Sequence, residues 1–93
     1  MDLGLVGKRA LVLGSSRGLG AAIARSLAAE GAHVIAAARG NDVTDGWIAA
    51  LPAEQRARAR AAKLDLADLA SVDALADKLV AEGGVDILVG NSG

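Results

Sequence analysis

Ala-Leu-Val-Leu-Gly-Ser-Ser-Arg-Gly-Leu-Gly, running from Ala10 to Gly20, is the stretch that decides the fold. An apolar run leads into three glycines and then into a helix-forming sequence. That order predicts a strand, a tight turn and a helix whose N-terminus can approach a phosphate. Gly14 can adopt backbone angles that a Cβ forbids, Gly18 keeps bulk away from a pyrophosphate, and Gly20 lets the helix lie close to the sheet. Glycine-rich turns are common, so this prediction depends on the sequence around the stretch.

The composition limits the class of protein. The 93 residues include 10 basic and 11 acidic side chains, with a net charge of −1, which predicts no surface for nucleic acid or an anionic membrane. No apolar run approaches the length of a membrane span, and residues 1–7 do not resemble a signal peptide. Cysteine is absent and the acidic residues are scattered, so we expect no disulfide and no metal site. These features favour one small cytoplasmic domain.

Strands and helices are expected to alternate along the chain. Short apolar runs predict strands at Arg9–Leu13, His33–Ala38, 59–65 and 85–89. Helical spacing predicts helices at 18–30, 41–51 and 68–82, with 52–58 compatible with one further turn of helix. The alternation predicts an α/β fold with a doubly wound parallel sheet, in the strand order 3-2-1-4. In that order the first and fourth strands end together, at Gly14 and Asn91.

Each helix has an expected inner face. For the first helix this face is Leu19, Ala22, Ile23 and Leu27, and for the second it is Val43, Trp47 and Leu51. Asp68 is expected to cap the last helix, which would pack through Val72, Leu75, Ala76, Leu79 and Val80. Trp47 is interpreted as a packing residue rather than one that stacks on a ligand.

Two motifs resemble those of the short-chain dehydrogenase/reductase family, and the resemblance covers all 93 residues. The family's Thr-Gly-x-x-x-Gly-x-Gly motif is similar to Leu13-Gly14-Ser15-Ser16-Arg17-Gly18-Leu19-Gly20, with leucine in place of threonine. Its Asn-Asn-Ala-Gly motif is similar to Gly90-Asn91-Ser92-Gly93, with two departures. The resemblance implies a Rossmann-type fold and identifies residues 1–93 with the N-terminal, cofactor-binding part of an NAD(P)-dependent oxidoreductase. We therefore expect the catalytic C-terminal part to lie outside this chain.

The resemblance also implies which residues hold the cofactor. Ser16 and Arg17 would contact phosphate through a hydroxyl, backbone N–H groups and a guanidinium; the alternative is an exposed polar turn. Arg39 directly follows the second strand, where NAD-preferring enzymes carry an acid for the ribose 2′-OH. An arginine there suits a 2′-phosphate, and so NADP rather than NAD; the alternative is a solvated side chain at a strand end.

Two further places complete the expected cofactor site. Asp65-Leu66 would lie against the adenine, unless Asp65 serves only as a turn or cap residue. Asn91 would support the cofactor beside its ribose. The full set expected to bind the cofactor is Gly14, Ser15, Ser16, Arg17, Gly18, Leu19, Gly20, Arg39, Asp65, Leu66, Asn91, Ser92 and Gly93.

The chemistry of the family requires residues that this sequence lacks. Its hydride transfer uses a serine and a Tyr-x-x-x-Lys motif, with tyrosine as general acid/base, and the chain contains no tyrosine. We therefore expect an NADP-dependent enzyme that acts on a small carbonyl or alcohol substrate, works as a homo-oligomer, and is represented here by its cofactor-binding half. The rival is a free-standing, non-catalytic nucleotide-binding module. A methyltransferase that uses S-adenosylmethionine is disfavoured, because Ala38-Arg39 stands where that class usually has an acid.

Overall fold

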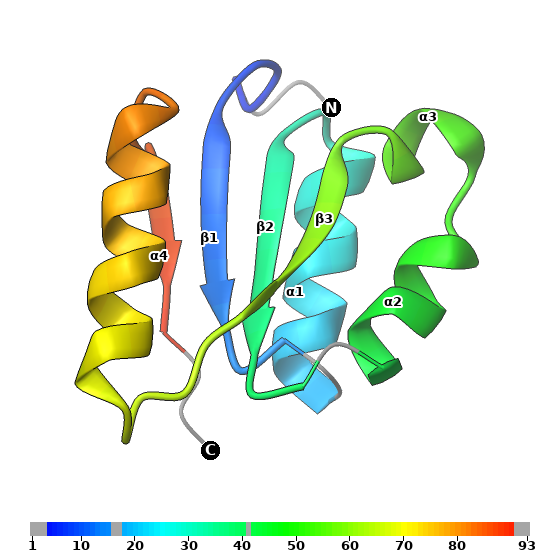
Figure 1. The fold of residues 1–93 in the computed structure, drawn as a ribbon. Coiled ribbons are helices and arrows are strands. Elements are labelled where there is room, and N and C mark those ends of the chain that lie inside the picture. The colour runs from blue at the N-terminus through cyan, green and yellow to red at the C-terminus, as the bar shows by residue number, and fades with distance from the viewer. Residues whose placement is uncertain (1–3, 16–17, 41, 91–93) are drawn as a thin grey trace.

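A four-stranded parallel sheet forms the centre of the molecule (Figure 1). The computed structural model describes residues 4–15, 18–40 and 42–90. The strands are β1 (Arg9–Leu13), β2 (His33–Ala38), β3 (Ala59–Lys63) and β4 (Ile87–Val89). Their order in the sheet is β3-β2-β1-β4, which confirms the predicted topology. The helices are α1 (Gly18–Ala29), α2 (Asp42–Ala49), α3 (Ala53–Arg56) and α4 (Leu69–Ala81), and α1 and α4 lie on opposite faces of the sheet.

The strand boundaries follow the sequence closely for the first two strands. β1 and β2 have the predicted bounds, and their register pairs Arg9 with His33 and Leu13 with Ala37. The fourth strand is shorter than predicted, because the residues before Ile87 are held differently. Asp86 donates its backbone N–H to the Arg9 carbonyl and accepts the Arg9 N–H with its carboxylate. A side chain thus replaces part of the strand ladder at the amino end of β4.

The core on the α1 side is built from small side chains. Its buried cluster consists of Val12, Ala24, Ala28, Ala32 and Val34. The predicted inner face of α1 is therefore wrong in part, since Leu19 is 67% exposed and Ala22 is exposed, while Ile23 and Leu27 are half-buried. The face that packs is Gly20, Ala21, Ala24 and Ala28. A flat face of glycine and alanine lets the helix backbone approach the strands, which a leucine stripe does not.

The other two predicted faces are correct in part, and Leu51, which follows α2, is buried as predicted. In α2 the buried residues are Thr44 and Ile48, Trp47 is half-buried, and Val43 is 44% exposed. In α4 only Leu79 is buried, Val72 and Leu75 are half-buried, and Ala76 and Val80 are exposed. The predicted stripe of α4 is too wide, because the helix is buried on the side of Val72, Leu75 and Leu79, whereas Ala76 and Val80 lie at the exposed margin of the stripe. Asp68 caps α4 as predicted and accepts the Ala70 N–H at 3.1 Å.

The topology brings the loops that carry the candidate residues to one edge of the sheet. All pairings are parallel, so the four strands end at the same edge. Gly14 follows β1, Arg39 follows β2, Asp65 lies two residues after β3, and Gly90 follows β4. The strand order reverses between β1 and β4, so the switch point of the sheet lies at the carboxyl ends of these two neighbouring strands. Ligands of open α/β sheets bind at such a point.

Candidate functional site

The glycine-rich turn has the backbone geometry that the sequence predicts. Gly14 and Gly18 both adopt a φ of 65°, which an L side chain rarely tolerates. A Cβ at Gly18 would meet no atom of the described residues within 4 Å, so the space beside this glycine is open. Helix α1 starts at Gly18, and Gly20 is buried. The turn therefore opens a helix with a free approach to its first residue, as an anion site requires. Ser16 and Arg17 lie outside the described residues.

Ser15 anchors this turn to the sheet. It is fully buried, and both its N–H and its hydroxyl donate to the Ala37 carbonyl of β2 at 3.2 Å. Its own carbonyl accepts the indole N–H of Trp47 at 3.0 Å. Because both donors of Ser15 are already used inside the protein, its evident role is to hold the turn. A direct contact of Ser15 with phosphate stays a prediction.

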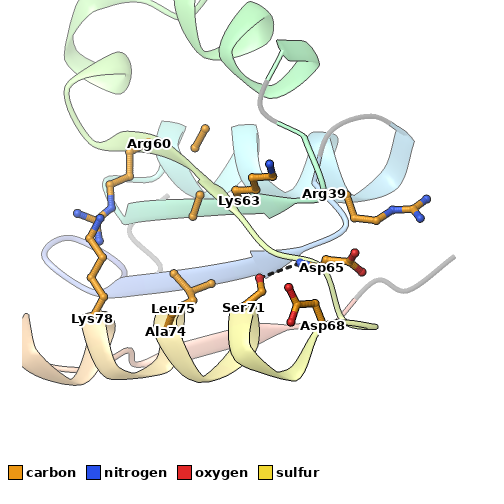
Figure 2. A pocket seen from close by; sticks show the side chains of 11 residues that line it. Arg39, Arg60, Lys63, Asp65, Asp68, Ser71, Ala74, Leu75 and Lys78 are labelled. Atoms are coloured by element: carbon orange, nitrogen blue, oxygen red, sulfur yellow. Dashed lines mark hydrogen bonds between the residues drawn. The ribbon is translucent and has the colours of Figure 1, made fainter.

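Arg39 extends from the end of β2 toward solvent. Its side chain is exposed and has no hydrogen-bond or ion-pair partner within residues 4–15, 18–40 and 42–90. It lies at one end of a groove of about 710 Å³ that runs between β3 and α4 (Figure 2). Asp65 and Asp68 also line this groove, yet neither forms an ion pair with Arg39. The guanidinium is thus available to an external anion.

Asp65 and Leu66 occupy the loop between β3 and α4. One carboxylate oxygen of Asp65 accepts the Ala67 N–H at 3.0 Å, and the Asp65 N–H donates to the Ser71 hydroxyl at 3.1 Å. The alternative role of Asp65 in a turn is therefore present, and it uses one of the two carboxylate oxygens. Leu66 is 54% exposed at the same edge. A contact of this pair with adenine stays a prediction.

The remaining predicted residues follow β1 or β4. Leu19 is exposed on the first turn of α1, directly after Gly18. Asn91, Ser92 and Gly93 lie outside the described residues, although Gly90, which precedes them, is exposed at the carboxyl edge. In the described part of the chain, no three His, Asp or Glu side chains gather as a metal ion would require. None of the helices described is long and apolar enough to cross a membrane.

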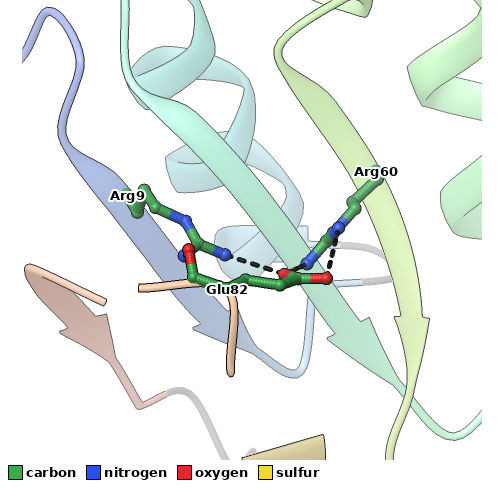
Figure 3. Close-up of polar contacts among 3 residues, drawn as sticks. All are labelled: Arg9, Arg60 and Glu82. Carbon is green, nitrogen blue, oxygen red and sulfur yellow. Dashed lines mark hydrogen bonds and ion pairs between the residues drawn. The ribbon is translucent and has the colours of Figure 1, made fainter. Parts of the chain in front are cut away.

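Sequence reasoning missed a set of charges at the opposite, amino edge of the sheet. Glu82, directly after α4, accepts hydrogen bonds from Arg9 of β1 and Arg60 of β3 (Figure 3). The Arg9–Glu82 distance is 2.9 Å, and Arg9 also donates to the Glu82 carbonyl at 2.6 Å. The Arg60 guanidinium, assisted by that of Arg9, holds the pKa of the Glu82 carboxyl below its usual value. Partners so far apart in sequence leave no local pattern that could reveal them.

Comparison with known proteins gives consistent matches. The family model described as short chain dehydrogenase matches residues 8–93. A 3-oxoacyl-(acyl-carrier-protein) reductase of Escherichia coli is 43% identical over 88 residues, which are 94% of this chain and 34% of the relative. A probable oxidoreductase of Streptomyces lividans is 43% identical over 89 residues, covering 96% of this chain and 29% of the relative. The chain thus spans about a third of the length of these relatives.

Solved structures agree with the sequence matches. L-sorbose reductase from Gluconobacter frateurii, complexed with NADPH and L-sorbose, superimposes with a TM-score of 0.87 at 39% identity, covering 100% of this chain and 36% of that one. A metagenomic short-chain oxidoreductase in complex with NADP gives a TM-score of 0.83 at 38% identity, covering 96% and 40% of the two chains. With the glycine turn at the switch point and the β3-β2-β1-β4 order, these matches show that the chain belongs to the short-chain dehydrogenase family.

Proposed function

We propose that this chain is the NADP-binding part of an oxidoreductase that transfers hydride between NADPH and a small carbonyl or alcohol substrate. The observation that carries the proposal is Arg39 at the carboxyl edge, which has no hydrogen-bond or ion-pair partner among the described residues. No acidic residue follows β2 before Asp42, so nothing there would favour a free ribose 2′-OH over a 2′-phosphate. Two similar solved structures contain NADPH or NADP, which supports the same cofactor here.

The proposed contacts divide the cofactor among the strand ends. The turn from Gly14 to Gly20 would hold the pyrophosphate with backbone N–H groups, helped by the hydroxyl of Ser16 and the guanidinium of Arg17. Arg39 would pair with the 2′-phosphate, and Asp65 and Leu66 would border the adenine. Asn91 and its neighbours Ser92 and Gly93 would lie beside the second ribose. Each contact comes from a loop at the carboxyl edge, so one extended dinucleotide could reach them all.

The chain's own residues bind and orient the cofactor, and the dinucleotide supplies the hydride when bound. The tyrosine that donates the proton in enzymes of this family would have to come from elsewhere, because residues 1–93 contain none. We propose that a tyrosine and lysine outside these 93 residues perform that step. Cytoplasmic location and a homo-oligomeric state stay predictions. Leu69 and Val80 of α4 are exposed, which is compatible with a second subunit covering this helix.

Calorimetric titration of the purified full-length protein with NADPH and NADH tests the proposal. We expect NADPH to bind at least about tenfold more tightly, because a charge-assisted pair with a phosphate is stronger than a neutral contact. Loss of NADPH absorbance on addition of small aldehydes and ketones then tests the reaction. Binding without turnover would favour the non-catalytic module. Failure to bind either dinucleotide would contradict both functions.

A further inference from the structure

Hydrogen bonds from two elements hold the glycine turn, and only one of these elements is a strand of the sheet. The N–H and hydroxyl of Ser15 both donate to Ala37 of β2. The Ser15 carbonyl points the other way and accepts the Nε1–H of Trp47 at 3.0 Å. Trp47 comes from α2, a helix that supplies none of the expected cofactor contacts. One residue of the turn, Ser15, is therefore held between β2 and α2.

Trp47 is itself held in place by its surroundings. Its side chain is half-buried and packs against the core cluster of Val12, Ala24, Ala28, Ala32 and Val34. The Arg25 guanidinium of α1 lies 5.9 Å from the centre of its ring, within the range of a cation–π contact. The indole thus contacts the turn through a hydrogen bond and the helix after the turn through its ring face. It is the only aromatic side chain of the sequence.

We propose that Trp47 is a positioning residue for the dinucleotide pyrophosphate, acting through the Ser15 carbonyl; this rests on the function proposed above. A backbone cradle binds an anion well only if its peptides are already oriented, since ordering them on binding costs affinity. A carbonyl bonded to the indole cannot turn its negative oxygen toward a phosphate. Trp47 therefore keeps the turn in its binding orientation, although it does not touch the cofactor.

The roles proposed for Trp47 and Arg39 concern different parts of the cofactor, so different ligands should respond to their loss. Arg39 is proposed to recognise the 2′-phosphate, which NADPH has and NADH lacks. The pyrophosphate is common to both dinucleotides and is missing from adenosine 2′-phosphate. Removal of the indole N–H should therefore weaken NADPH and NADH equally and leave adenosine 2′-phosphate unaffected.

The test compares Trp47→Phe with Ile48→Val in the purified full-length protein. Phenylalanine keeps a ring but cannot donate, whereas Ile48 is buried in the same helix and has no side-chain hydrogen bond. By calorimetry, Trp47→Phe should weaken both dinucleotides about three- to tenfold, which is the usual worth of one neutral hydrogen bond. Its affinity for adenosine 2′-phosphate should match that of the wild type. Ile48→Val should change no affinity.

A second measurement does not depend on the cofactor. Amide hydrogen exchange of Ser15 in the free protein should be faster in Trp47→Phe than in the wild type or Ile48→Val, because the hydrogen bond from the indole no longer restrains this residue. Equal weakening of all three ligands by Trp47→Phe would overturn the proposal in favour of general destabilisation. Unchanged dinucleotide affinity together with unchanged Ser15 exchange would also overturn it. Failure of wild-type protein to bind any dinucleotide would instead overturn the proposed function, and the exchange result alone would then decide whether Trp47 orders the turn.

Discussion

The two edges of the sheet treat their arginines differently. At the amino edge, Arg9 and Arg60 both bind the Glu82 carboxylate, and the Arg9 N–H binds Asp86 (Figure 3). At the carboxyl edge, Arg39 has no partner within the described part of the chain. The ion pairs at the amino edge thus join β1, β3 and the end of α4. The guanidinium of Arg39 at the carboxyl edge is free of such contacts and can bind a ligand.

A paired and an unpaired arginine also lie within a single groove. Arg39 and Arg60 line the same space between β3 and α4, and Figure 2 shows them at its two ends. Both are exposed, so exposure does not separate a binding residue from a structural one. Their partners do separate them. A guanidinium already bonded to a carboxylate has few donors left for a ligand, whereas an unbonded guanidinium has all five.

Charge reversal at Arg39 should produce the largest effect. Arg39→Asp removes the proposed pair with the 2′-phosphate and adds repulsion, so NADPH affinity should fall about ten- to a hundredfold. NADH affinity should be spared, because NADH lacks that phosphate. Calorimetric titration with both dinucleotides measures the change. Arg17 would share the phosphate and so reduce the loss.

Arg60→Gln is the matched control, since it changes an arginine of the same groove. It should leave the affinity for both dinucleotides unchanged, because Arg60 acts at the other edge. If Arg60→Gln weakened NADPH as much as Arg39→Asp, the groove as a whole would attract the phosphate, and the distinction between the two edges would disappear.

The strands and the turn could be predicted from sequence because their signals are local. β1 and β2 are apolar runs with glycines nearby, and their bounds agree with the prediction. Gly14 was expected to adopt backbone angles that a Cβ forbids, and it has a positive φ, as does Gly18. The strand order followed from the alternation of strands and helices together with the rule for switch points.

The helix faces could not be predicted as well, because alanine carries a weak hydrophobic signal. The periodicity of α1 pointed to its larger residues, Leu19 among them, but close packing selected the face with Ala24 and Ala28. In the candidate site, Trp47 was expected to pack, and it does. Its bond to Ser15 could not be foreseen, since the two residues lie 32 positions apart. Nor could sequence show that both donors of Ser15 are used internally.

The backbone of the two edges can be compared through two glycines with positive φ, Gly31 and Gly18. Gly31 follows α1 toward the amino edge with a φ of 97°, and a Cβ there would lie 2.8 Å from Val6 Cγ2. Gly31→Ala should lower the free energy of unfolding by about 1–2 kcal/mol through backbone strain, and the crowded methyl of Val6 adds to this unless it moves. It should not alter dinucleotide affinity, which can be measured beside urea unfolding.

Gly18→Ala should show a different balance between stability and binding. Its φ of 65° imposes a similar strain of about 1–2 kcal/mol. The open space beside it, however, is where the pyrophosphate is proposed to lie, so dinucleotide affinity should fall as well. Loss of affinity in Gly31→Ala but not in Gly18→Ala would contradict the assignment of the phosphate to the turn.

Glu82→Gln should have the smallest effect, and it should depend on pH. The two arginines lower the pKa of Glu82 in the folded protein, so its contribution to stability is complete above its unfolded value of 4.5 and is lost as pH falls through the lower, folded pKa. Urea midpoints of the wild type should therefore decline more than those of Glu82→Gln between about pH 7 and about pH 3.

Glu54→Gln is the control for this measurement, because Glu54 is exposed on α3 and its replacement should leave the wild-type decline intact. Parallel declines for wild type and Glu82→Gln would mean that the ion pairs of the amino edge are fully screened by solvent. In that case the hydrogen bonds of Arg9 to the Glu82 carbonyl and to Asp86 would be what joins α4 and β4 to β1 at that edge.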